Sequence, residues 1–224
     1  MKTNLLSFLV FTVFSFQSAY AVKYFVTPDG SEDSDGLSWE TSTSLNAILT
    51  STKLSEGDEI FVKKGTYVAP EGASFTCNRA DVKVYGNCEG TESEKPVSYQ
   101  LDNIETFLKG SGRRVLYFKT ASYFVGFDIS GGDAYNSTAG AAGRVYIDHP
   151  DGMIEYCIVH DNYGSKTDGS IKGVGGGVYA RGIVKNCIVE NNIAIAADGK
   201  KPGVGGGVCL DGGYLLNSII RNNH

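Results

Sequence analysis

Short apolar runs and turn residues alternate along most of the chain. Valine, isoleucine and tyrosine occur in stretches of a few residues, and glycine or asparagine interrupts them, most regularly near the carboxyl end. These stretches show no helical periodicity. Runs of this kind, bounded by glycine and asparagine, are typical of short strands joined by tight turns. The pattern therefore predicts an all-β protein.

The strongest repeats lie near the carboxyl end. The string GVGGGVY occupies residues 173–179, and GVGGGVC begins 30 positions later, at Gly203. Four copies of the aliphatic strand that accompanies this string, the first of them weak, occur at residues 123–132, 153–162, 183–192 and 214–223. A fixed period of this size indicates stacked units, because each unit is too thin to bury its own apolar face. Three strands and their turns in each coil predict a parallel β-helix, with neighbouring coils about 4.8 Å apart.

Stacking of the repeats places equivalent residues in columns. The inward columns are expected to be Cys157–Cys187–Ser218 and Val159–Val189–Ile220. Asn162, Asn192 and Asn223 should form a ladder at a turn, because asparagine tolerates the left-handed conformation and can bond its stacked neighbour. Successive side chains of a strand point to opposite faces, so His160, Glu190 and Arg221 should lie on the outer face. Glu155 should lie on the outer face as well, stacked on Lys185. Upstream, the same 30-residue offset places Val145–Ile147 on Val115–Tyr117.

The repeat also carries a family resemblance. The pattern GVGGGVY…NCIVENN resembles the right-handed parallel β-helix repeat of bacterial surface proteins in the broad pectate-lyase-like superfamily, and it is similar to the Gly-Gly-aliphatic, Asn-rich repeat of chlamydial polymorphic outer-membrane proteins. Residues 24–67 are similar to the amino-terminal module of exported bacterial β-helix proteins, including GLSW at 36–39 and the strand GDEIFVKKGTY. The resemblance implies a right-handed parallel β-helix in an exported bacterial protein.

Three segments are expected along the chain. Residues 1–21 have the features of a signal peptide: Lys2 precedes an apolar run, and Ala19-Tyr20-Ala21 is a cleavage site that makes Val22 the mature start. Residues 22–57 should form a strand, a loop and a short capping helix at 42–49, which would cover the apolar end of the solenoid. Residues 58–224 should form the β-helix.

The repeat pattern at the carboxyl end indicates a truncated solenoid. The chain stops directly after an Asn turn, so the last coil should expose Val208, Leu215, Ser218 and Ile220 together with an unpaired strand edge. Solenoids need capped ends, and open edges recruit other chains. We therefore expect either an incomplete piece of a longer protein or end-to-end self-association.

Composition narrows the range of partners. The chain has 224 residues, enough for one domain, and a formal net charge of −5 with no basic run, which argues against nucleic acid as a partner. The apolar run at the amino terminus is too short for a transmembrane span, so none is expected after signal cleavage. Five cysteines leave at least one without an intramolecular partner. Cys157 and Cys187 are expected to be buried thiols, and a disulfide between the two coils is the alternative. Cys77 and Cys88 could also form a disulfide, and their spacing does not decide whether they do.

Enzymatic chemistry has one main candidate cluster. A lyase on this fold needs a cation and a base, and a hydrolase needs two carboxylates at a set separation. His160, Glu190 and Arg221 could supply an acid, a base and an electrophilic arginine. The structural interpretation, a solvated ladder of alternating charge, is favoured because no second acid is expected in these columns. The acid-pair, Gly-His-Gly and Arg-centred motifs of β-helix galacturonidases and pectate lyases are absent, and the segment 148–151 (DHPD) is expected to be a turn.

Binding and metal candidates lie in loops. Loops 131–142, 163–172 and 193–202 fall at the same turn of successive coils and should form one flank, whose binding candidates are Tyr135, Tyr163, Lys166, Asp168, Asp198 and Lys200. Asp29, Asp33 and Asp35 could hold Ca²⁺, since hard cations take clustered carboxylates, although the same residues are ordinary turn formers. No other cofactor is expected.

These observations favour an exported non-catalytic β-helix module of the surface, adhesin or carbohydrate-binding type. It would be secreted or held at the outer cell surface, where it would contact polysaccharide or a host surface. The alternative is a polysaccharide lyase or glycoside hydrolase of the β-helix class, or a remnant of one, because a fold does not fix a function.

Overall fold

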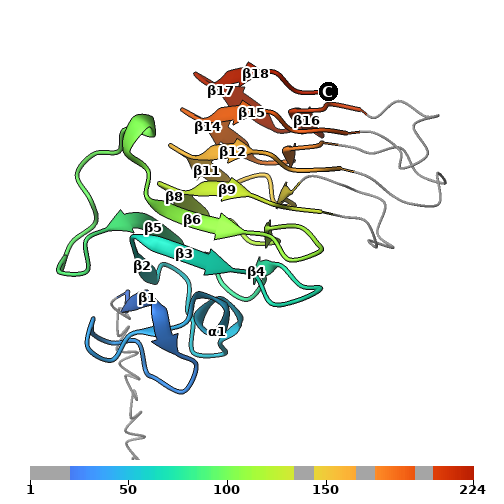
Figure 1. The fold of residues 1–224 in the computed structure, drawn as a ribbon. Helices are drawn as coiled ribbons and strands as arrows, with labels where there is room; N and C mark the ends of the chain where they lie inside the picture. The colour runs from blue at the N-terminus through green and yellow to red at the C-terminus, as the bar shows by residue number, and fades with distance from the viewer. Residues whose placement is uncertain (1–20, 134–143, 165–174, 195–203) are drawn as a thin grey trace, which may run out of the picture.

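The computed structural model describes residues 21–133, 144–164, 175–194 and 204–224. Within them the chain passes repeatedly through three parallel sheets, and successive passes lie one above another from the amino-terminal to the carboxyl-terminal end (Figure 1). Strands of three residues dominate the later passes. The arrangement is consistent with a parallel β-solenoid, and it confirms the prediction of an all-β fold.

The sheets are named here in the order in which each pass visits them. In the described part of the chain, the first sheet consists of β1 (Lys23–Ser31), β2 (Glu59–Lys63), β5 (Lys83–Cys88), β8 (Tyr123–Val125), β11 (Met153–Glu155), β14 (Ile183–Lys185) and β17 (Tyr214–Leu216). The second consists of β3 (Gly65–Val68), β6 (Thr106–Lys109), β9 (Asp128–Ser130), β12 (Ile158–His160), β15 (Ile188–Glu190) and β18 (Ile219–Arg221). The third consists of β4 (Phe75–Cys77), β7 (Leu116–Phe118), β10 (Val145–Ile147), β13 (Val178–Ala180) and β16 (Val208–Leu210).

One α-helix lies beside the first coil. The helix α1 spans Leu45–Thr50, and Ser44 caps it by accepting a hydrogen bond from the backbone N–H of Ala47 at 3.2 Å. Its apolar side packs into the main core, where Leu45, Ile48 and Leu49 are buried. A 3₁₀ turn, η1, spans Leu101–Asn103. The strand β1 runs from Lys23 to Ser31, and Ser31 forms a bridge with Thr43.

The predicted columns are present in the carboxyl-terminal coils. Val159 pairs with Val189, and Val189 pairs with Ile220. Glu155 pairs with Lys185 in register, and their side chains form a salt bridge at 2.9 Å. One predicted register is wrong by one residue: Val145 pairs with Leu116 rather than Val115. Side chains alternate between faces, and only this register places the rings of Tyr146 and Tyr117 together on the outer face, 5.0 Å apart.

The asparagine ladder is also present. The Asn162 side-chain N–H₂ donates to Oδ1 of Asn192 at 2.9 Å, and that of Asn192 donates to Oδ1 of Asn223 at 3.0 Å. The left-handed conformation, however, belongs to the residue before each ladder asparagine, with φ of 49° to 54° at Asp161, Asn191 and Asn222. The ladder residues themselves point inward, because their amides satisfy buried carbonyl groups of the coil below.

The ladder explains the glycine-led repeats. A Cβ atom on Gly177 would lie 2.8 Å from the side-chain nitrogen of Asn192, and one on Gly207 would lie 2.7 Å from that of Asn223. Glycine at these positions therefore lets the third sheet approach the ladder closely.

All five cysteines are free thiols. Cys157 and Cys187 are buried in one inward column, as expected, and burial is the main cause that raises the pKa of Cys157. Cys77 and Cys88 are also buried but belong to strands of different sheets, β4 and β5.

The last coil is open to solvent in this structure. Leu215 and Ile220 are exposed, whereas Val208 and Ser218 are partly buried. Among the described residues, no helix has the length and apolar character needed to cross a membrane.

Candidate functional site

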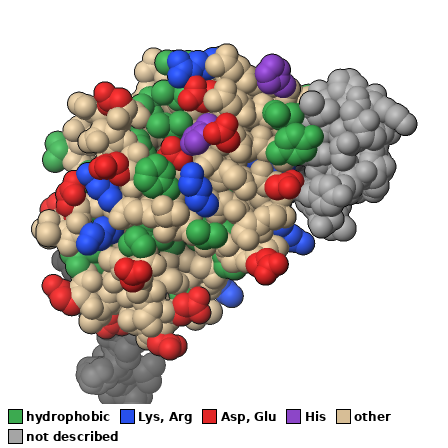
Figure 2. Space-filling model, in the orientation of Figure 1, with side chains coloured by type: hydrophobic (Ala, Val, Ile, Leu, Met, Phe, Trp, Pro, Cys, Tyr) green, Lys and Arg blue, Asp and Glu red, His purple; other side chains and the backbone are tan. Residues whose placement is uncertain are grey.

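The catalytic candidates lie together on the outward face of the second sheet. His160 pairs in register with Glu190, and Glu190 pairs with Arg221. The Arg221 Nε donates to Glu190 Oε2 at 2.6 Å. Figure 2 shows acidic, basic and histidine side chains close together on the face turned to the viewer. The predicted cluster therefore exists as a group of neighbouring side chains.

The contacts of His160 differ from those expected. Its Nε2 lies 3.0 Å from Asp128 Oδ1, and its Nδ1 lies 2.7 Å from Asp161 Oδ2. No second acid was expected in the columns of this cluster. Asp128 lies in the neighbouring column, as the register partner of Ile158, and reaches His160 diagonally from the coil below. Asp128 is nearly buried, and Lys109 lies 3.9 Å from its carboxylate while donating to Ser130 Oγ at 2.6 Å.

The electrostatics of the cluster argue against a general base. The hydrogen bond to Asp128, helped by Asp161, raises the pKa of His160 to about 9 although burial opposes the change. The imidazole is therefore protonated at neutral pH and cannot accept a proton from a substrate. Arg221 is already paired with Glu190. Each charged group faces an opposite charge, which is what a structural ladder requires.

The segment 148–151 forms a turn, as predicted, in which the backbone N–H of Gly152 donates to the carbonyl of His149 at 3.1 Å. The Asp148 carboxylate pairs with Arg181 at 2.8 Å, and Arg181 reaches Asp211 at 3.1 Å. These ion pairs border the outward face of the third sheet.

That face carries a ladder of three tyrosines. The rings of Tyr117 and Tyr146 are stacked with an angle of 9° between them, and Tyr179 meets Tyr146 edge-on at 5.0 Å. The hydroxyl of Tyr179 donates to Asp211 at 2.6 Å. The hydroxyls of Tyr146 and Tyr179 are both bonded to carboxylates, which fixes the two rings on this face.

The predicted metal residues do not converge. Asp29 lies within β1, whereas Asp33 and Asp35 lie in the following turn. Hydrogen bonds from Thr41 and from the backbone of Leu37 lower the pKa of Asp35. Across the described ranges, no group of three or more His, Cys, Asp or Glu side chains is placed to hold a metal ion. Calcium binding stays a prediction.

Most of the predicted loop site cannot be placed. Tyr135, Lys166, Asp168, Asp198 and Lys200 lie outside the described residues. Tyr163 is described: it is half-exposed and bridges Asp133 in the coil below and Ile193 in the coil above. The starts of the three loops therefore stack, as expected.

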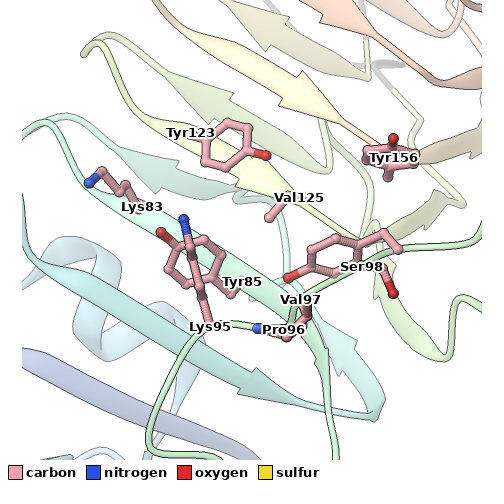
Figure 3. Close-up of a pocket in the computed structure, with 10 residues that line it drawn as sticks. Lys83, Tyr85, Lys95, Pro96, Val97, Ser98, Tyr123, Val125 and Tyr156 are labelled. Atoms are coloured by element: carbon pink, nitrogen blue, oxygen red, sulfur yellow. The ribbon is translucent and has the colours of Figure 1, made fainter.

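The sequence did not point to a pocket on the outward face of the first sheet (Figure 3). Its volume of about 440 Å³ falls within the range of about 300–1,000 Å³ that is usual for small-molecule sites. We call it the tyrosine pocket, and its lining consists of Lys83, Tyr85, Lys95, Pro96, Val97, Ser98, Tyr99, Tyr123, Val125 and Tyr156.

Outward positions of successive strands form the floor. Lys83 of β5 pairs in register with Tyr123 of β8, and Tyr85 pairs with Val125. The rings of Tyr85 and Tyr123 meet edge-on with centroids 6.3 Å apart. The Tyr123 hydroxyl donates to Glu155 at 2.7 Å and the Tyr85 hydroxyl donates to Glu59 at 3.1 Å, which holds both rings in place.

The segment 89–100 forms the wall opposite the floor. The Glu92 carboxylate accepts three backbone N–H groups of its own loop, and the Trp39 indole N–H donates to the Glu92 carbonyl at 2.9 Å. Lys23 donates to the Ser93 carbonyl at 2.6 Å. The stem of this segment is thus tied to the first coil, and residues 95–99 project over the sheet.

Tyr99 rests directly on the backbone of Gly126. A Cβ atom on Gly126 would lie 2.3 Å from the Tyr99 ring, and the φ of this glycine is 78°. The Tyr99 hydroxyl is buried and has no hydrogen-bond partner among the described residues. A buried hydroxyl without a partner is costly to the fold.

Tyr156 completes the pocket from an unusual backbone position. Its φ is 48°, in the left-handed region that bulky residues avoid, and its ring stacks on that of Tyr99 with centroids 6.1 Å apart. The equivalent turns of the next two coils hold Asn186 and Asn217, also with positive φ. A backbone outlier of this kind costs about 1–3 kcal/mol and supports a hypothesis of function.

The sequence contained a signal for this site. Tyr156 occupies the position of Asn186 in an otherwise well-matched repeat, so a departure from the repeat marked the residue. Tyr85 and Tyr123 gave no such signal, because outward tyrosines are ordinary in strands. Tyr99 lies in a polar loop whose position over the sheet depends on distant contacts.

Comparison of the chain with family models, with curated proteins and with solved structures found no match.

Proposed function

We propose that this protein is an exported, non-catalytic module that binds saccharides in the tyrosine pocket, on the scaffold of a right-handed parallel β-helix. Right-handed crossover connections between parallel strands of one sheet are the rule and support the proposed handedness. The signal peptide at 1–21 supports export and a place outside the cell or at its surface.

The observation that carries the proposal is the convergence of four tyrosines on one pocket. Two of them, Tyr85 and Tyr123, are fixed on strands, and the others, Tyr99 and Tyr156, stack on each other. A sugar ring has an apolar C–H face and a rim of hydroxyl groups. Tyrosine matches both features, because its ring offers an apolar surface and its hydroxyl a hydrogen bond.

The enzyme alternative has less support. His160 is protonated at neutral pH and is therefore not a general base, and Arg221 is held by the carboxylate of Glu190. None of the described residues that line the tyrosine pocket carries a carboxylate. A lyase or hydrolase needs a base or an acid pair at the substrate, so the pocket favours binding over turnover.

The test is glycan binding by the chain that begins at Val22, followed by calorimetry on any glycan that binds. Replacing Tyr156 by Asn restores the residue of the neighbouring coils, so the fold should be kept or slightly stabilised while affinity falls about tenfold through loss of the stacked ring. Tyr214→Ala is a matched control, because Tyr214 is an exposed residue on β17 of the same sheet, far along the stack.

The proposal fails if no glycan binds, or if Tyr156→Asn binds as tightly as the unmodified protein. Release of unsaturated products or new reducing ends from a polysaccharide, abolished by Glu190→Gln or Arg221→Ala, would instead establish the enzyme alternative.

A further inference from the structure

The charged residues that line the tyrosine pocket all have the same sign. Lys83 and Lys95 are the charged side chains of the lining, and both are exposed. In Figure 3 the two lysines lie toward one end of the pocket and Tyr156 toward the opposite end. The pocket thus combines an aromatic part with a cationic end, in a protein whose formal net charge is −5.

These two lysines differ from others in the structure. Lys23, Lys64, Lys109 and Lys185 each form an ion pair with a carboxylate. Neither Lys83 nor Lys95 forms an ion pair with a described residue. Glu59 is the register neighbour of Lys83, but it accepts the Tyr85 hydroxyl instead. The two ammonium groups are therefore not held in ion pairs by the side chains described, although the Glu59 carboxylate lies on the adjacent strand.

The lysines come from two independent elements. Lys83 is fixed on β5 of the floor, and Lys95 lies on the loop that forms the wall. An anionic group between them would receive charge-assisted hydrogen bonds from both sides, and these are about twice as strong as neutral ones. A neutral sugar could accept hydrogen bonds from the ammonium groups only through its hydroxyl oxygens, without the attraction between opposite charges.

We propose that the tyrosine pocket selects saccharides that carry an ionised acidic group, a carboxylate or a sulfate ester, with Lys83 and Lys95 as the anion-binding residues and the tyrosines as the ring-binding residues. This inference rests on the proposed saccharide-binding function. It adds a specificity that the four tyrosines alone would not provide.

The test compares charged polysaccharides with their neutralised forms. The probes are hyaluronan and carboxyl-reduced hyaluronan for the carboxylate, heparin and desulfated, carboxyl-reduced heparin for the sulfate, and dextran as a neutral glycan. Binding is measured by calorimetry at low and high salt, because screening weakens contacts between exposed charges. The expected result is binding to at least one charged probe, with a loss of about tenfold or more on neutralisation or in Lys83→Gln or Lys95→Gln.

Two further variants separate the effect of the pocket lysines from a general effect of charge and from the effect of the tyrosines. Lys53→Gln removes an exposed lysine outside the pocket and should leave affinity unchanged. Tyr156→Asn should weaken charged and neutral saccharides alike, whereas the lysine variants should weaken only the charged ones.

Neutral glycans that bind as well as charged ones, with no effect of either lysine variant, would overturn this inference and leave the proposed function intact. Binding of charged probes that neither the lysine variants nor Tyr156→Asn weakens would place the anion elsewhere and also overturn it. If the protein binds none of these glycans, both the proposed saccharide-binding function and this inference about charge are wrong.

Discussion

His160 shows how position within a coil sets the chemistry of one residue. In sequence it is an outward residue of a repeat, equivalent to Glu190 and Arg221. In the structure it lies between the carboxylates of Asp128 and Asp161, and the bond to Asp128 is the main reason that its pKa rises to about 9. A catalytic histidine needs a pKa near the working pH, so this environment makes His160 a fixed cation.

The raised pKa predicts a pH dependence of stability. The folded pKa is above the unfolded value of about 6.5, so the contribution of His160 is fully present below pH 6.5 and is lost as pH rises through 9. The difference in unfolding free energy between the unmodified protein and His160→Gln should shrink by about 1–2 kcal/mol from pH 6 to 9.5, a figure reduced for the partial exposure of the ring. Urea unfolding at several pH values measures it.

Asp128→Asn provides the second arm of that experiment. It removes the largest cause of the pKa rise and should abolish most of the same pH dependence while His160 is retained. A difference between the unmodified protein and His160→Gln that stays constant over this pH range would contradict the argument.

At the scale of elements, the asparagine ladder joins the second sheet to the third. Asn192 is fully buried, donates to the carbonyl of Val159 at 2.9 Å and accepts the amide groups of Asn162. Asn192→Ala would leave several buried polar groups without partners, and we expect a loss of about 3–5 kcal/mol of unfolding free energy.

Asn217→Ala is the matched control for the ladder. Asn217 is an exposed asparagine with positive φ that bonds Asn186, so its replacement should cost only about 1 kcal/mol. Denaturant titrations of both variants give the comparison. Equal losses in the two variants would show that the buried ladder has no special role.

The elements also show what the sequence could reveal. Repeats at a fixed spacing predicted the columns from Met153 onward, because stacking imposes the same inward residue on each coil. The register at Val145 was missed by one residue, since the chain between β7 and β10 does not keep the 30-residue spacing. The tyrosine pocket was missed because the segment 89–100 is placed by Lys23 and Trp39, which lie far away in sequence.

At the scale of the whole molecule, the first residue after the proposed signal peptide contacts a buried carboxylate at the amino-terminal end of the stacked coils. The backbone nitrogen of Val22 lies 2.8 Å from Asp58 Oδ1, and Asp58 is 1% exposed. The other oxygen of that carboxylate accepts the backbone N–H of Ser55 at 2.8 Å. In an uncut chain the Val22 nitrogen is a neutral amide. Cleavage after Ala21 would convert it into an ammonium group beside a carboxylate that is already held in place.

We therefore predict that removal of the proposed signal peptide stabilises the fold. A protein that begins at Val22 should have an unfolding free energy about 1–2 kcal/mol higher than the same protein with an acetylated Val22, because acetylation restores the amide. Asp58→Asn should lower the stability of both forms and remove the difference between them, since the ion pair needs the carboxylate. Thermal and urea unfolding of the four proteins measures this. If the free and acetylated forms unfold alike while Asp58 is present, the contact is an ordinary hydrogen bond, and processing adds nothing to the stability of the stack.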